Sequence, residues 1–155
     1  MAVGVLLVLS VASNLEEDRP GASGPAGLGD PARDGQFEFV VRSVDCGARS
    51  VGEGIGRKQA LGQFCLVSFR VRNTGTEGRT FGGGQQYVFD RDGNRHDPDL
   101  AATVGNGGGR LWSTRLNPGQ RLAGTLVYDV PERVVPARIE LHDAPFSGGA
   151  SVALR

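Results

Sequence analysis

The sequence has little of what proteins that bind nucleic acids or anionic membranes usually carry. It contains one lysine, Lys58, and its 17 basic residues balance 17 acidic ones, so the formal net charge is zero. A chain without a net positive field does not attract nucleic acid or anionic lipid over long range. We therefore expect no nucleic-acid partner, and membrane contact only through the N-terminal segment.

Motifs for cofactor binding and nucleophilic catalysis are also missing. Gly52–Lys58 looks like a phosphate-binding loop, but Gln59 stands where the P-loop needs serine or threonine. Arg57 stands where a dinucleotide-binding motif needs its third glycine, so this segment is predicted to be a mobile loop. Ser147 lacks the leading glycine of a nucleophile elbow. We expect no enzymatic activity and no cofactor.

Two groups of residues raise the question of a metal site. One is an acidic run between strands, made of Asp90, Asp92, Asn94, Asp97 and Asp99. Its oxygens are of the kind that Ca²⁺ prefers, but the run lacks the glycine, distal glutamate and flanking helices of an EF-hand. A tight hairpin turn is the simpler interpretation. His96 and His142 have no second pair of ligands and are predicted to be solvated, so no metal is expected.

Helical periodicity is absent, whereas apolar and polar residues alternate strongly around Gln63–Asn73. Side chains of one parity are apolar (Cys65, Val67, Phe69, Val71) and those of the other are polar (Ser68, Arg70, Arg72). A period of two places these sets on opposite faces of a strand, one buried and one solvated. We predict that this segment is the central strand of the fold.

The rest of the folded region reads as further short strands separated by turns. They are expected at 36–44, 85–89, 111–113, 121–130, 138–142 and 150–154, with long loops at 48–62 and 101–110. Trp112 is expected to close one end of the core. About seven alternating strands in about 120 residues predict an all-β, immunoglobulin-like antiparallel β-sandwich.

The N-terminal region divides into two parts. Residues 1–12 are apolar and end in small residues, which fits the core of a signal peptide, although the basic segment that should precede it is missing. The segment is therefore expected to be a signal peptide or the remainder of a truncated membrane anchor, with an edge strand as the alternative. Residues 13–35 contain three prolines and little to bury, so a flexible linker is expected before a folded domain at 36–155.

The two cysteines, Cys46 and Cys65, fit neither a redox motif nor a zinc site. In an exported protein such a pair usually forms a disulfide, whereas in a cytosolic protein the two cysteines usually remain as buried thiols. Because the N-terminus indicates export, we predict a bridge that closes a loop of about 20 residues and contributes roughly 3 kcal/mol.

A set of motifs in order along the chain carries a family resemblance. It comprises Gly62–Val67, Arg72–Gly75, Phe89–Gly93, Leu116–Gly119 and Gly124–Pro131. The chain resembles a bacterial family of domains of unknown function with a telokin-like, immunoglobulin-type fold, similar in kind to a secreted mycobacterial immunoprotective antigen. The resemblance implies an extracytoplasmic sandwich and brings no catalytic residues.

These observations predict a non-catalytic domain, secreted or anchored to the cell membrane. It is expected to be a monomeric binding module of the bacterial cell envelope, with an envelope protein or cell-wall component as partner. The alternative is a structural spacer or accessory domain without a ligand of its own. Function on such folds resides in loops and sheet edges, so the expected contact surfaces are Gly47–Gly62, Gly82–Gly84 and Asn106–Gly109.

Overall fold

Strand β3 (Lys58–Asn73) lies at the centre of the fold in a computed structural model that describes residues 24–155. It pairs with β2 on one side and β8 on the other. The four apolar residues that share a parity, Cys65, Val67, Phe69 and Val71, are all buried. Arg70 is half-buried and Arg72 is exposed on the opposite face. The predicted central strand is confirmed.

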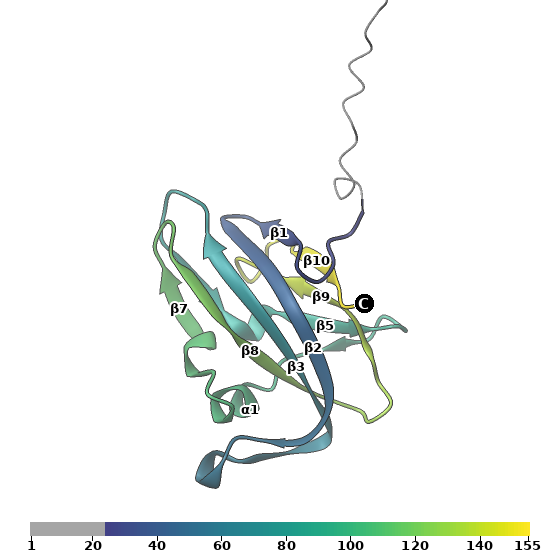
Figure 1. Cartoon of the computed structure of the whole chain (residues 1–155). Helices are drawn as coiled ribbons and strands as arrows, with labels where there is room; N and C mark the ends of the chain where they lie inside the picture. The colour runs from purple at the N-terminus through teal and green to yellow at the C-terminus, as the bar shows by residue number, and fades with distance from the viewer. Residues whose placement is uncertain (1–23) are drawn as a thin grey trace, which may run out of the picture.

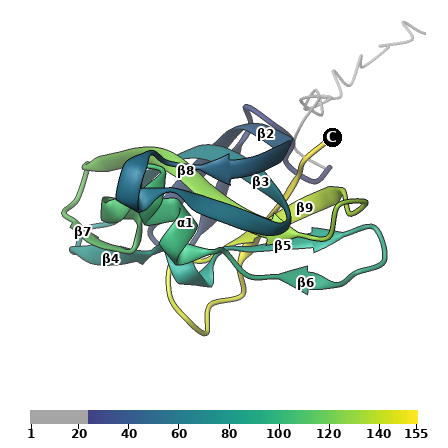
Figure 2. The ribbon, with the colours of Figure 1, turned by 90° about the horizontal axis from the view of Figure 1, so that it is seen from below.

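Two antiparallel sheets and a small ribbon make up the sandwich, and Figure 2 shows the sheets as two facing layers. The first sheet has the order β1 (Pro31–Asp34), β2 (Phe37–Val51), β3, β8 (Arg121–Val130). The second has the order β10 (Ala150–Ala153), β9 (Pro136–Leu141), β5 (Tyr87–Asp90), β6 (Arg95–His96). The ribbon pairs β4 (Arg79–Gly82) with β7 (Ser113–Leu116). The predicted antiparallel β-sandwich is confirmed.

The described residues contain ten strands, where the sequence predicts about seven. The additional strands are β1, β4 and β6, which span four residues or fewer, and strands this short show little alternation. Strand β1 falls within the predicted linker 13–35 and pairs with β2, with Ala32 opposite Phe39. The folded domain therefore begins before residue 36. The predicted signal-like segment 1–12 and the linker part at 13–23 lie outside the described residues.

The prediction of a long loop at 48–62 is wrong. Strand β2 continues to Val51 and β3 begins at Lys58, so the two form a long hairpin whose far end projects beyond the rest of the sandwich (Figure 1). A 3₁₀ turn at Gly54–Gly56 forms its tip. Gly47 hides the strand in the sequence, because glycine usually signals a turn. Here Gly47 has a φ of 104° beside a register shift, and the ladder continues past it.

Four phenylalanines and one tyrosine fill the space between the layers. Phe81 of the ribbon contacts Phe69, with ring centroids 5.5 Å apart, and also lies against Phe37 and Phe39. Tyr128 is fully buried, and its hydroxyl donates to the backbone carbonyl of Gln86 at 2.8 Å. The aromatic packing of Phe81 thus holds the ribbon to strands β2 and β3 of the first sheet.

The helical segments are short. The prediction of a loose segment at 101–110 is wrong. It contains helix α1 (Leu100–Gly105), which Asp99 caps by accepting a hydrogen bond from the Ala102 amide at 2.9 Å. Two 3₁₀ turns occur at Gly83–Gln85 and Gly109–Leu111. Six residues are too few to show a helical period, so capping is the main local signal. Among residues 24–155, no helix has the length and apolar character needed to cross a bilayer.

Candidate functional site

A groove of about 630 Å³ opens where the β4–β7 ribbon meets the segment that follows β9. The residues important for its chemistry are Arg79, Gln85, Trp112, Asp143 and Pro145. Trp112, predicted to close the core, is instead 56% exposed, and the neighbouring Leu111 is buried in its place. The groove therefore presents an aromatic surface beside a guanidinium and an amide, in a volume typical of ligand sites.

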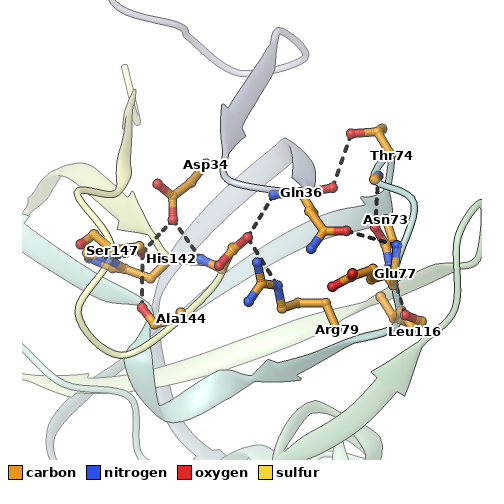
Figure 3. Close-up of polar contacts among 12 residues, drawn as sticks. Asp34, Gln36, Asn73, Thr74, Glu77, Arg79, Leu116, His142, Ala144 and Ser147 are labelled. Atoms are coloured by element: carbon orange, nitrogen blue, oxygen red, sulfur yellow. Dashed lines mark hydrogen bonds and ion pairs between the residues drawn. The ribbon is translucent and has the colours of Figure 1, made fainter.

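Asp34, the last residue of β1, fastens one wall of the groove, as Figure 3 shows. Its Oδ2 accepts hydrogen bonds from the Ser147 hydroxyl at 2.5 Å and the Asp143 amide at 2.7 Å, and its Oδ1 accepts from the Gly149 amide at 3.1 Å. Burial alone raises the pKa of Asp34, but these hydrogen bonds outweigh it and hold the pKa below its usual value. The carboxylate thus ties the segment after β9 to β1.

Asp143 joins the same wall to the turn between β1 and β2. Its Oδ2 accepts from the Gln36 amide at 2.7 Å and lies 3.5 Å from Arg79 Nε. Gly35, with a φ of 55°, permits this approach, because a Cβ there would meet Asp143 Oδ2 at 1.9 Å. Arg79 Nε is buried without a hydrogen bond, while the side chain as a whole remains 40% exposed. The arginine is held in place and still open to the groove.

His142 is buried, with 6% of its surface exposed, so its predicted solvation is wrong. Its Nε2 lies 2.8 Å from Glu140 Oε1, and its Nδ1 lies 3.1 Å from both the carbonyl and the hydroxyl oxygen of Ser147. A nucleophilic serine must give its proton to the imidazole. Here the Ser147 hydroxyl donates to Asp34 instead, so Ser147 and His142 stabilise the loop that follows β9. No sequence pattern indicates the contact between Ser147 and Asp34, because the two residues are 113 positions apart.

The acidic run after β5 forms the predicted tight turn. Asp90 Oδ1 accepts from the amides of Asp92 at 2.9 Å and Asn94 at 3.0 Å. Asp97 pairs with Arg95, and Asp99 caps α1, so these carboxylates serve separate local purposes. Within residues 24–155, no three histidine, cysteine, aspartate or glutamate side chains are grouped so as to hold a metal ion.

His96 is also more buried than predicted, because it pairs with Asp90. The Nε2 of His96 lies 3.0 Å from Asp90 Oδ2. This hydrogen bond is the main cause that lowers the pKa of Asp90 from 3.8 to about 2. Burial raises the pKa, but the hydrogen bonds from Asn94 and Asp92 lower it further. The fold therefore favours the ionised carboxylate.

We expect this carboxylate to stabilise the fold in a pH-dependent way. Because its pKa is lower in the folded state, its contribution is fully present above pH 3.8 and is lost as the pH falls through about 2. Replacing Asp90 by asparagine should flatten the acid side of a plot of urea midpoint against pH. Asp92→Asn, at an exposed carboxylate in the same turn, is the control. An unchanged acid profile in Asp90→Asn would contradict the assignment.

Each glycine-rich stretch predicted as a contact surface borders a groove. Gly82 and Gly84 line the groove beside Trp112. The tip of the β2–β3 hairpin, with Ile55 fully exposed, forms with α1 a second groove of about 440 Å³. Asn106–Gly108 line a third, of about 450 Å³, beside β8. Residues 100–113 border all three in succession, a continuity that no sequence motif indicates.

Cys46 and Cys65 form the predicted disulfide, although the geometry differs from the prediction. They lie opposite each other in the β2–β3 ladder, so the bridge joins two paired strands instead of closing an irregular loop.

The two facing antiparallel sheets, with a disulfide across one hairpin and grooves built on loops, define a β-sandwich domain of the immunoglobulin-like kind. Residues 26–151 match the family described as a domain of unknown function (DUF4352), and the chain belongs to that family. No curated protein matches the sequence.

Solved structures resemble the chain in fold. The yjhA protein from Bacillus subtilis is 16% identical, with a TM-score of 0.62 over 84% of this chain and 99% of its own. MPT63, a secreted protein from Mycobacterium tuberculosis, is 15% identical, with a TM-score of 0.57 over 81% of this chain and 95% of its own. A putative lipoprotein of Bacillus subtilis, ycdA, is 11% identical, with a TM-score of 0.51 over 79% of this chain and 38% of its own.

Proposed function

We propose that this chain is a non-catalytic binding module of the bacterial cell envelope, whose ligand site is the groove that contains Arg79 and Trp112. The observation that carries the proposal is the placement of Trp112. The chain has one tryptophan, and it is 56% exposed over a groove instead of contributing to the core. Exposing a large aromatic ring has a cost in water, which a bound ligand offsets by covering it.

The groove suits a ligand that combines an apolar face with a carboxylate. The indole of Trp112 offers a flat surface for stacking, and the guanidinium of Arg79 is a strong partner for a carboxylate. Asp143 balances only part of that charge, because its oxygen already accepts the Gln36 amide. Peptidoglycan fragments carry both a sugar ring and carboxylates, and are the cell-wall component that we propose.

A location outside the cytoplasm is part of the proposal. The Cys46–Cys65 disulfide supports it, because such bonds persist in oxidising compartments. The signal-like composition of residues 1–12 supports it too, and leaves secretion and membrane anchoring as the two routes. The similarity in fold to a secreted protein and a putative lipoprotein is consistent with either.

The single tryptophan makes the proposal directly testable. Soluble peptidoglycan fragments titrated into the protein should shift or quench the emission of Trp112, since no other tryptophan contributes. Arg79→Gln, followed by the same emission, should weaken binding about tenfold through loss of the charged hydrogen bond. Trp112→Ala, followed by calorimetry, should abolish the heat of binding.

Arg57→Gln, at the exposed hairpin tip, is the matched control and should bind as the wild type does. An unchanged emission up to saturating fragment concentrations, in a folded protein, would contradict the proposed ligand. If envelope extracts also return no reproducible partner, the domain acts as a spacer.

A further inference from the structure

Strand β8 is an outer strand of the first sheet among the described residues, and only part of its outer edge is covered. Near its C-terminal half, the Val127 carbonyl accepts from the Asp99 amide at 2.7 Å. The Val127 amide donates to the Thr103 hydroxyl at 3.0 Å. The loop before α1 and the helix itself therefore occupy the edge at Val127.

The edge is open two and four residues earlier. Backbone groups in an antiparallel strand point to alternate sides, so Thr125 and Ala123 direct their N–H and C=O groups the same way as Val127, away from β3. Within residues 24–155, no hydrogen bond to the backbone of Thr125 or Ala123 occurs on that side. The sheet thus presents unpaired donors and acceptors, as an edge that accepts another strand does.

A groove of about 450 Å³ runs beside this open edge. Its far wall is formed by Asn106–Gly108 and Arg110, and its near wall by Arg121–Thr125. One residue of an added strand occupies about 160 Å³, taking a rise of 3.3 Å, a strand spacing of 4.8 Å and a thickness of 10 Å. The groove therefore has room for about three residues of an extended chain.

The charge around the groove is positive. Arg110 and Arg121 line it. Arg70 and Arg72 lie opposite Ala123 and Arg121 in the β3–β8 ladder, so they share a face with them. In the described part of the chain, none of these four arginines forms a salt bridge. Glu38, opposite Arg72 in β2, is already paired with Arg33.

We propose that the open edge of β8 binds an extended acidic peptide by β-strand addition, in the groove between Ala123–Thr125 and Asn106–Arg110. The peptide backbone pairs with Ala123 and Thr125, and its acidic side chains lie beside the arginines, where opposite charges across strands are favourable. A second copy of this chain fits less well, because its β8 would bring further arginines into the same sheet. This site is separate from the Trp112 groove.

The test uses the full chain and a fluorescently labelled eight-residue peptide that alternates glutamate with threonine. Its anisotropy should rise on titration with the protein, and a peptide with lysine in place of glutamate should not bind. The amide resonances of Ala123 and Thr125 should shift in NMR spectra and become protected from exchange.

Ala123→Pro is the decisive variant, because it removes the outward N–H, which the β3 ladder does not use. It should weaken peptide binding about tenfold, and Ala123→Ser should not. Arg110→Gln combined with Arg121→Gln provides a second variant that leaves the backbone unchanged and should also weaken binding about tenfold. Trp112→Ala should bind the peptide normally, which separates this site from the proposed ligand site.

Three results would overturn the proposal. The first is equal binding of the glutamate and lysine peptides. The second is undiminished binding by a folded Ala123→Pro variant, which would mean that the arginines attract polyanions without strand pairing. The third is self-association of the wild-type protein that Ala123→Pro abolishes, which would assign the edge to a second copy.

Discussion

Replacing Gln86 by leucine should lower the free energy of unfolding by about 3–5 kcal/mol. Gln86 is fully buried, and its Nε2 donates to the carbonyls of Gly82 at 2.9 Å and His142 at 3.0 Å. Its Oε1 accepts from the His142 amide at 2.7 Å. Leucine fits a similar volume but leaves these backbone groups without partners inside the protein. Urea denaturation followed by circular dichroism measures the loss.

Two variants provide the comparison for this effect. Gln59→Leu makes the same chemical change at an exposed strand position and should alter stability by less than about 0.5 kcal/mol. Tyr128→Phe removes only the hydroxyl that donates to the Gln86 carbonyl and should cost about 1 kcal/mol. Equal stabilities of Gln86→Leu and Gln59→Leu would contradict the role of Gln86.

Replacing both Cys46 and Cys65 by alanine should cost about 3 kcal/mol, chiefly because the unfolded chain regains the freedom that the bridge removes. The cysteines are 19 residues apart in sequence and directly opposite in the ladder, so the native hairpin keeps its pairing without the bond. The variant should therefore fold, with a lower urea midpoint and a steeper dependence on urea, since its unfolded state is less compact.

Reduction of the wild-type protein with dithiothreitol provides the matched comparison, since it opens the same bond without changing the sequence. Reduced wild type and the alanine variant should agree in midpoint. If the alanine variant were as stable as the oxidised wild type, the disulfide would contribute nothing to folding.

The strands that the sequence predicts well are those long enough to show a period. Gln63–Asn73 and Arg121–Val130 each carry an alternation, and both are strands. The expected face of β3 is buried, whereas in β8 Leu126 and Tyr128 are buried together with Val127 of the other face. The sequence predicts a loop beyond Cys46 because Gly47 and the charged residues after it obscure the alternation of the hairpin strands. Part of this hairpin packs in a second, smaller hydrophobic cluster, where Val51 lies with Phe64 and Val127.

The candidate site was only partly foreseeable. Glycine-rich stretches indicated where the grooves lie, because glycine marks loops, and loops border binding surfaces. The residues that give one groove its chemistry carry no such signal: the sequence predicts Trp112 in the core, and Arg79 and Asp143 belong to no motif. Nothing in the sequence connects Ser147 with His142, although Asp34 and Glu140 join them into one network.

The fold class and the disulfide follow from the chain alone, because alternation with a period of two and a pair of cysteines are visible in the sequence. Tertiary structure alone decided which polar groups meet. Asp34 reaches Ser147 across 113 residues, and the open edge at Ala123 exists because α1 covers Val127 and stops there. Such contacts depend on how elements remote in sequence pack, and short polar residues carry no periodic signal of where they will lie.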